Sequence, residues 1–384
     1  MLRIAIPYGL FNSQQMRMFA KIADKYDRGY GHFTTRQNIQ FNWLKLEETP
    51  EILADLASVQ MHAIQTSGNC VRNITSDPFA GVAADEIVDP RPICELLRQW
   101  STLHPEFAFL PRKFKIAVSS SKEDRAIVAA HDLGLFLRNN EQGELVADVL
   151  VGGGMGRTPI IGTIIQYGLP WQELPNYISA VLRVYNLHGR RDNLYKARIK
   201  ILLKALGVEE FTRQVNEEYQ YWRGGHQAFT QEEWNQVAQY FVKPAYKTLP
   251  SLNEEPIVLQ APESERTSFS RWLERNVKKH QIPGYASVLL SLKPHGTVAP
   301  GDIDSSQMIK ISNLADQYSF GLIRSTHEQN LVLADVEQTR LYELWKEAKS
   351  LGLALPNIGL LTDIIACPGG DFCSLANAKS IPIA

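Results

Sequence analysis

Two cysteines near the end of the sequence are the residues with the most specific chemistry. Cys367 and Cys373 are separated by five residues and lie in a loop that begins Pro368-Gly369-Gly370. Paired thiols on a glycine-rich loop are typical of iron–sulfur ligands, and such clusters normally take four thiolates. Cys70 and Cys94 have no partner at ligand spacing, so we expect them to be small buried hydrophobes. The ligand set is then either completed elsewhere or interrupted by the end of the sequence, and we favour the second interpretation.

A second group of residues carries positive charge. Lys113 and Lys115 lie two residues apart in a predicted strand over 113–119, so they project from one face about 7 Å apart. Arg36 stands on the polar side of another predicted strand, and Arg72 adds a fourth cation. If these side chains are buried together, they form an anion-selective pocket. A solvated strand face remains the alternative for each of them.

A basic segment follows between residues 190 and 204. Lys196, Lys200 and Lys204 fall on one stripe of a predicted helix, and Arg198 lies between them. A solvated face is the plain interpretation. A nucleic-acid surface lacks support from the charge balance and from interleaved aromatic residues. A polycarboxylate ligand fits better, because hydrogen bonds to charged groups contribute about 1.5–3 kcal/mol each.

A glycine-rich turn follows a strand predicted over 148–152. Its sequence is Gly152-Gly153-Gly154-Met155-Gly156-Arg157. No Gly-Lys-Ser/Thr follows, so the turn is not a P-loop, and it also fails the dinucleotide fingerprint. Glycines without a side chain let the backbone lie against a large flat ring. We therefore expect a cofactor contact here.

Composition narrows the class of protein. The sequence has 384 residues, a net charge of −1 and 44% hydrophobic residues, as in ordinary globular domains. Near-neutral charge gives no reason to expect a nucleic acid or a membrane as partner. Four cysteines do not form a disulfide framework, so a reducing cytoplasm is the expected compartment.

An internal repeat sets the predicted architecture. Shifting residues 13–38 by 292 positions gives ten identities without a gap, among them Met16/Met308 and Gln37/Gln329. We interpret this as a duplicated half, so two homologous lobes are expected about a pseudo-twofold axis. Each copy predicts a helix capped by Ser13 or its equivalent, then an alternating strand through Phe33 and Phe41, then a helix over about 50–62.

This order predicts an α+β fold of ferredoxin-like type. Between the copies lies a longer block with strands and a mostly helical stretch over 171–206, interrupted near 188–189. The boundaries we predict are 1–62 for the first ferredoxin-like half-domain, 63–243 for an α/β cofactor domain, 244–284 for a linker and helix, 285–350 for the second half-domain, and 351–384 for the start of a second cofactor domain.

Together these motifs resemble one family, the sulfite and nitrite reductases that use sirohaem coupled to a [4Fe–4S] cluster. The resemblance covers essentially the whole sequence, including the duplication. It rests on Gly31–Asn38 (GHFTTRQN), Gly68–Asn73 (GNCVRN), Leu110–Lys115 (LPRKFK), Val151–Gly154 (VGGG), Lys196–Lys200 (KARIK) and the Cys367-x5-Cys373 pair.

The resemblance implies sirohaem and a [4Fe–4S] cluster as cofactors, and a six-electron reduction of sulfite to sulfide or of nitrite to ammonia. By position, Arg36, Arg72, Lys113 and Lys115 match the four cations around the substrate, and Cys367 and Cys373 match cluster ligands. The residues expected to bind sirohaem are Arg36, Gln37, Asn38, Asn73, Arg112, Gly152, Gly153, Gly154, Arg157, Lys196, Arg198 and Lys200.

Lys115 favours sulfite, since nitrite-specific members often carry Asn at that position. The expected protein is therefore an assimilatory sulfite reductase haemoprotein, with a ferredoxin-dependent nitrite reductase and a non-catalytic tetrapyrrole- or anion-binding homologue as alternatives. Ferredoxin and a flavoprotein both remain open as electron donor. The family carries a second cysteine pair that this sequence lacks, so we expect truncation at both ends, and an isolated chain that neither builds a stable cluster nor ligates sirohaem iron properly.

Overall fold

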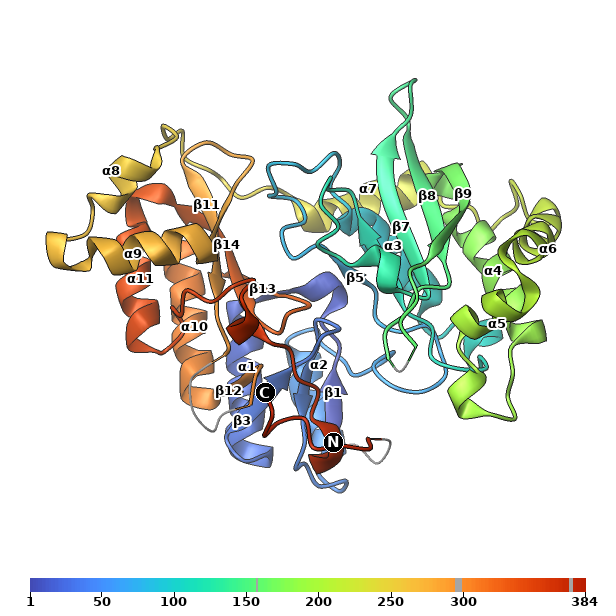
Figure 1. Ribbon diagram of the computed structural model, residues 1–384, viewed down its shortest axis with the longest axis horizontal. Helices are drawn as coiled ribbons and strands as arrows, with labels where there is room; N and C mark the ends of the chain where they lie inside the picture. The colour runs from blue at the N-terminus through green and yellow to red at the C-terminus, as the bar shows by residue number, and fades with distance from the viewer. Residues whose placement is uncertain (157, 294–298, 373–375) are drawn as a thin grey trace. The chain divides into compact units, whose positions relative to one another are not determined.

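The computed structural model describes residues 1–156, 158–293, 299–372 and 376–384. Two compact units are formed by these residues (Figure 1). Unit 1 consists of Met1–Ala63, Val82–Ala84 and Pro244–Ala384, and unit 2 of Ile64–Gly81 and Asp85–Lys243. The finer domain boundaries given above stay a prediction.

Unit 1 contains the two copies of the repeat. The first copy comprises β1 (Leu2–Ile4), β2 (Leu10–Asn12), α1 (Ser13–Tyr26), β3 (Tyr30–Phe33), β4 (Ile39–Phe41) and α2 (Thr49–Ser58). The second copy follows α8 (Glu254–Val258) and α9 (Glu263–Asn276). It comprises β10 (Val277–Lys279), β11 (Tyr285–Leu290), β12 (Asp302–Asp304), α10 (Ser305–Tyr318), β13 (Leu322–Ser325), β14 (Leu331–Glu337) and α11 (Leu341–Ser350).

The two copies exchange strands. The first sheet has the order β1-β4-β3-β12, and the second has the order β10-β11-β14-β13-β2. The short strand β12 of the second copy therefore completes the sheet of the first, and β2 of the first completes the sheet of the second. The helices α1 and α10 lie side by side (Figure 1). This reciprocity agrees with the predicted pseudo-twofold arrangement.

Equivalent residues of the two copies also make equivalent backbone contacts. The amide of Ser13 donates to the carbonyl of Gly321 at 2.8 Å, and the amide of Ser305 donates to the carbonyl of Gly29 at 2.9 Å. The buried core draws on both copies, with Met16 and Met308 each fully inaccessible to solvent. A shared core of this kind makes the two lobes one folding unit.

Helix α1 begins differently from the prediction. Asn12, not Ser13, is the N-cap: its side chain accepts from the amide of Gln15, whose side chain accepts in turn from the amide of Asn12. This capping box satisfies two amides that the first helical turn leaves unpaired. Ser13 is the first residue of the helix. Asp304 and Gln307 form the same capping box at the start of α10.

Unit 2 is built on one mixed sheet of order β5-β6-β7-β8-β9. Its strands are β5 (Thr75–Ser76), β6 (Ile116–Ser119), β7 (Leu133–Asn139), β8 (Leu145–Val151) and β9 (Thr163–Pro170). The pairs β5–β6 and β6–β7 are parallel, and the remaining pairs are antiparallel. Its helices are α3 (Arg91–Ser101), α4 (Leu174–His188), α5 (Ile199–Leu206), α6 (Val208–Gln220) and α7 (Gln231–Ala238).

The α+β class is confirmed, but three local predictions were wrong. Arg36 is not in a strand: β3 ends at Phe33 and β4 begins at Ile39, so Arg36 lies in the turn between them. Lys113 and Lys115 precede β6, which begins at Ile116. Residues 34–38 are all polar, and residues 113–115 alternate in an extended lead-in to β6, so the sequence pattern alone does not locate the end of either strand.

The third wrong prediction placed Lys196, Lys200 and Lys204 on one stripe of a single helix. Helix α5 begins at Ile199, with Arg198 as its extended N-cap residue, and Lys196 lies in the preceding 3-10 turn. Only Lys200 and Lys204 share the helix. The break at 188–189 was predicted correctly, because α4 ends at His188. Among the residues described, no helix has both the length and the apolar character needed to cross a membrane.

Candidate functional site

Positive side chains gather in unit 2 where two segments run side by side. Val71 and Phe114 form a parallel bridge, and the amide of Arg72 donates to the carbonyl of Phe114 at 2.8 Å. This register places Arg72 next to Lys113 and Lys115. We call Arg72, Arg112, Lys113, Lys115 and Arg198 the cationic cluster.

The ammonium of Lys113 is the most perturbed member of the cluster. Burial, followed by repulsion from Arg72, Arg198 and Arg112, lowers its pKa to about 8. Removing a charge from water disfavours the charged form, and nearby like charges add to the effect. Strongly perturbed groups of this kind concentrate at functional sites, although structural clusters produce them too.

Arg72 is held by the loop that precedes it. Its guanidinium donates to the carbonyl of Thr66 at 2.8 Å and to the carbonyl of Gly68 at 2.8 and 3.1 Å. Asn73, predicted to bind cofactor, is buried, and its backbone amide donates to the backbone carbonyl of Gln65 at 2.9 Å. The loop from 65 to 73 therefore fixes the guanidinium in place.

A buried carboxylate that the sequence analysis missed lies within the cluster. Asp132 is fully inaccessible to solvent. One of its oxygens accepts two hydrogen bonds from Arg198, at 2.9 and 2.7 Å. The other accepts from the backbone amide of Lys115 at 2.9 Å. Nothing in the local sequence signals this role, because the partner arginine lies 66 positions further along the chain.

The glycine turn packs closely against its surroundings. A Cβ atom on Gly153 would lie 2.3 Å from the carbonyl oxygen of Ala129, so only glycine fits there. Gly152 has φ of +87°, a conformation that favours glycine. A Cβ on Gly154 would approach the side chains of Lys200 and Arg198 at 3.1 and 3.3 Å. The turn thus brings bare backbone next to two cations.

Lys200 is tied to this turn. Its ammonium donates to the carbonyls of Thr158 at 2.5 Å, Met155 at 2.9 Å and Gly154 at 3.4 Å. These contacts make Lys200 a support for the turn, and burial lowers its pKa. Lys196, by contrast, is exposed. Arg157, also predicted to bind cofactor, lies outside the described residues.

The turn that carries Arg36 belongs to unit 1. The amide of Thr34 donates to the carbonyl of Asn38 at 2.8 Å, and Gln37 has φ of +57°. The side chain of Asn38 accepts from the amide of Ile6 at 3.0 Å, and that of Gln37 donates to the carbonyl of Ser325 at 3.0 Å. These contacts shape the turn, and the cofactor-binding roles predicted for Arg36, Gln37 and Asn38 stay predictions.

The predicted cluster ligands are described only in part. Cys367 is exposed, and Cys373 lies outside the described residues. Ala366, next to Cys367, is clamped by the side chain of Gln329, which accepts from its amide at 2.9 Å and donates to its carbonyl at 3.0 Å. The part of the chain that the structure describes contains no group of three or more His, Cys, Asp or Glu side chains able to hold a metal ion.

The other two cysteines are not placed as ligands. Cys94 is fully buried in α3, as predicted, whereas Cys70 is only half-buried and donates to the carbonyl of Ser67 at 3.3 Å. Burial raises the pKa of both thiols. A raised pKa disfavours the thiolate that metal binding requires.

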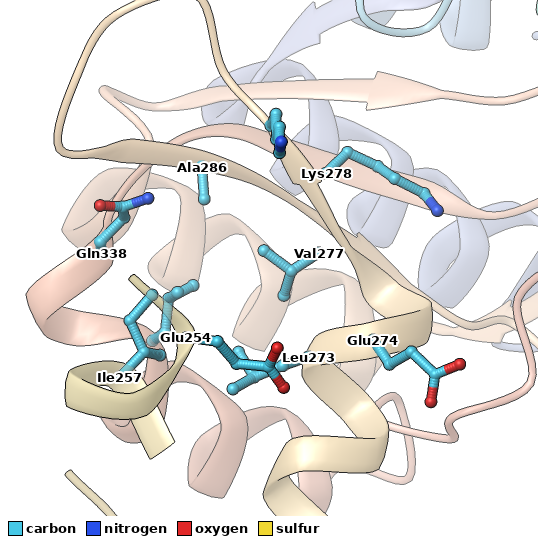
Figure 2. A pocket seen from close by; sticks show the side chains of 10 residues that line it. Glu254, Ile257, Leu273, Glu274, Val277, Lys278, Ala286 and Gln338 are labelled. Carbon is cyan, nitrogen blue, oxygen red and sulfur yellow. The ribbon is translucent and has the colours of Figure 1, made fainter. Parts of the chain in front are cut away.

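Unit 1 also contains a pocket of about 230 Å³ (Figure 2). Its wall is mainly apolar, with Ile257, Leu273 and Val277 facing the cavity, while Glu274 and Lys278 lie at its rim. None of the predicted site residues lines it. The pocket is therefore separate from the chemistry discussed above.

Comparison with known proteins bears on these features. Residues 67–223 match the family model described as the nitrite and sulphite reductase 4Fe-4S domain. Residues 1–59 and 295–351 match the nitrite/sulfite reductase ferredoxin-like half domain. The second match occurs twice, once in each copy of the repeat, which confirms the prediction of ferredoxin-like half-domains.

Individual relatives extend the comparison over the whole chain. The chain is 27% identical to sulfite reductase (ferredoxin) 1 of Mycolicibacterium paratuberculosis, over 99% of this chain and 60% of that protein. It is 29% identical to the chloroplastic ferredoxin–nitrite reductase of Arabidopsis thaliana, over 98% and 59%. The solved structure of the Mycobacterium tuberculosis NirA protein superposes with a TM-score of 0.77 at 23% identity, over 99% of this chain and 62% of that one. The chain thus spans about 60% of the length of these relatives.

Proposed function

Because this chain belongs to the nitrite and sulfite reductase family, we propose that it acts in the six-electron reduction of sulfite to sulfide, as an assimilatory sulfite reductase haemoprotein. The family consists of oxidoreductases, and its cofactors are sirohaem and a [4Fe–4S] cluster. The observation that carries the proposal is the cationic cluster, in which a half-buried lysine with a pKa of about 8 stands among arginines.

The described residues fit sirohaem. Sirohaem is a flat macrocycle edged with carboxylates, so it needs bare backbone and fixed cations. Gly154 provides the bare backbone, and a Cβ there would lie only 3.1 and 3.3 Å from the side chains of Lys200 and Arg198. Arg198 provides a fixed cation, because Asp132 fixes its guanidinium and leaves other N–H groups to donate. When bound, sirohaem supplies the redox-active iron to which the anion binds.

The fit to the cluster is only partial. A [4Fe–4S] cluster normally takes four thiolates, and the described residues offer Cys367 alone as an exposed thiol. Cys373 is the second expected ligand.

The side chains of the cationic cluster define what the protein does to its substrate. Arg72, Lys113 and Lys115 attract a small oxyanion and donate hydrogen bonds to its oxygens. With its pKa of about 8, Lys113 holds a proton at neutral pH and releases it more readily than an ordinary lysine. Sulfite reduction consumes protons as water leaves, so Lys113 is suited to supply them.

Nitrite is the second candidate substrate, because relatives named for sulfite and for nitrite match this chain equally well. Lys115 favours sulfite as the substrate, since a second lysine two residues after Lys113 suits the more highly charged anion. Both sets of relatives carry ferredoxin in their names. Reduced ferredoxin is accordingly the proposed electron donor, with a flavoprotein as the alternative.

The test uses the chain produced in a host that makes sirohaem and purified without oxygen. We expect a tetrapyrrole absorbance that shifts on addition of sulfite, and reduction of sulfite faster than that of nitrite with reduced ferredoxin. Purified protein that binds no sirohaem even when supplied in excess contradicts the proposal. Sirohaem binding without turnover of either anion favours a non-catalytic homologue, and preferential turnover of nitrite favours the second candidate.

A further inference from the structure

Asp132 joins three segments that were predicted separately as parts of the site. Its carboxylate accepts from the side chain of Arg198 and from the backbone amide of Lys115. Its carbonyl accepts from the amide of Gly152 at 3.0 Å. The basic segment, the Lys-x-Lys segment and the glycine turn therefore converge on one residue.

We propose that Asp132 is the positioning residue of the cationic cluster: its buried carboxylate fixes the guanidinium of Arg198 so that it faces a carboxylate of bound sirohaem, and fixes the backbone of Lys115 so that its charge faces the substrate anion. The proposal rests on the function proposed above and adds to it a residue that the motifs did not single out. Asp132 acts through Arg198 and Lys115, and contact with the substrate is not part of its role.

The geometry of the carboxylate supports this role. Both donors from Arg198, Nε and Nη2, reach the same oxygen of Asp132, which orients the plane of the guanidinium. The second oxygen remains for the amide of Lys115. A fully buried carboxylate with both oxygens used in this way has a single low-energy orientation. Arg198 is thereby held at the N-terminus of α5, and a guanidinium has further N–H groups that can donate to a ligand.

The charges around Lys113 also support the positioning role of Asp132. Arg72, Arg112 and Arg198 all lower the pKa of Lys113, whereas Asp132 raises it. A cluster of like charges repels itself unless a counter-charge is buried with it. Asp132 provides that counter-charge from inside the protein, so the outer face of the cluster keeps its attraction for an anion.

The plainer interpretation is an ordinary buried ion pair that only stabilises the fold. The chain offers a control with the same kinds of donor at a less buried carboxylate. Asp148, in the same sheet, accepts two hydrogen bonds from Arg138 at 2.9 Å each and one from the amide of Gly168 at 2.8 Å. It has the same donor set as Asp132, one arginine and one backbone amide, but it is not among the groups that shift the pKa of Lys113.

The experiment compares Asp132→Asn with Asp148→Asn in the full chain. One readout is the pKa of Lys113, followed by NMR of its ε-methylene group and assigned with Lys113→Arg. The other is the affinity of the sirohaem-free chain for sirohaem, measured by absorbance titration. We expect Asp132→Asn to lower the pKa of Lys113 below its wild-type value and to weaken sirohaem binding at least 10-fold. We expect Asp148→Asn to change neither, whatever it does to thermal stability.

Equal effects of the two substitutions on both readouts would overturn the proposal. If Asp132→Asn does not fold, Asp132→Glu replaces it: the charge is kept, so the pKa of Lys113 stays near the wild-type value. The extra methylene displaces Arg198, so sirohaem binding is still expected to weaken, and unchanged binding by this variant also contradicts the proposal. If no variant and not even the wild type binds sirohaem, the proposed function fails, while the pKa of Lys113 still reports on the positioning role.

Discussion

Gln37 and Gln329 make the same hydrogen bond in opposite directions between the two copies of the repeat. The amide group of Gln37 donates to the carbonyl of Ser325 at 3.0 Å, and that of Gln329 donates to the carbonyl of Phe33 at 2.9 Å. Phe33 and Ser325 are themselves equivalent positions of the repeat. Both glutamines have left-handed backbone, with φ of +57° and +63°. Each copy therefore uses its own turn to hold the last strand residue of the other.

Gln329 also clamps both backbone groups of Ala366, the residue before Cys367. We expect Gln329→Ala to release the segment around Cys367, because removing the side chain leaves buried backbone groups unpaired, at about 1–3 kcal/mol each. Hydrogen–deuterium exchange of the peptide containing Ala366 should accelerate. Gln37→Ala is the control and should leave that peptide unchanged. Equal exchange in the two variants would show that the clamp does not hold the segment.

The second prediction concerns the pH dependence of anion binding. Lys113, with its pKa of about 8, loses its charge as the pH rises from 7 to 9. Nitrite binding by the sirohaem-loaded chain should therefore weaken across this range, whereas the charge of nitrite itself stays constant. Lys113→Arg should keep the affinity and remove the dependence, because an arginine stays protonated. Unaltered dependence in this variant would assign the titration to another group.

The same shift affects stability with a definite sign. The pKa of Lys113 is lower in the folded chain than its ordinary value of 10.5, so the unfolded chain binds more protons between about pH 8 and 10.5. The contribution of Lys113 to the free energy of unfolding therefore rises with pH over that window. Lys113→Met should be more stable than the wild type at pH 7, with a gain that shrinks above pH 8. Thermal unfolding monitored by circular dichroism across this range tests the expectation.

The fourth prediction separates two neighbouring glycines. Gly153→Ala places a methyl group against the backbone oxygen of Ala129 at 2.3 Å, and backbone cannot move aside cheaply, so we expect a large loss of stability. Gly154→Ala meets only the flexible side chains of Lys200 and Arg198. It should fold normally and yet bind sirohaem more weakly, since the methyl group occupies the space next to the cations. Thermal melting and absorbance titration together distinguish the two outcomes.

The fifth prediction addresses substrate preference. Lys115→Asn removes one charge from the cationic cluster, and sulfite carries more negative charge than nitrite at neutral pH or above. The affinity ratio of sulfite to nitrite should fall by about 10-fold or more, as expected when a charged hydrogen bond is lost. Competition between the two anions for the sirohaem-loaded chain measures this ratio. Lys204→Asn, an exposed lysine on α5, is the control, and a similar shift in both variants would refute the role of Lys115.

Much of the fold could be predicted from the amino-acid sequence. The repeat predicted two equivalent lobes, and the capping and periodicity of each copy predicted its helices within a few residues. The extent of the strands was less predictable. Residues 34–38 are all polar and lie between the apolar residues Phe33 and Ile39, so the sequence did not show that the left-handed backbone of Gln37 turns the chain there. A turn that is stabilised by contacts with residues almost 300 positions away has no local signature.

The candidate site shows the same limit. The cations and the glycine turn were recognisable because charge and the absence of a side chain are properties of single residues. The residues that hold these groups in place were not recognisable in that role, because Asp132 and Lys200 act through partners 66 and 42–46 positions away. Lys200 was predicted to bind cofactor, but in the structure its ammonium contacts backbone carbonyls of the turn.

By itself, the sequence determined which chemical groups this protein has and that its architecture is duplicated, since residue types and their repetition are written along the chain. Only the tertiary structure decided which of those groups are buried or held in place by hydrogen bonds from other residues. Burial and hydrogen bonding depend on residues that meet only after folding: it is folding that surrounds Lys113 with arginines, places a buried carboxylate behind Arg198, and lets Gln329 hold the residue before Cys367.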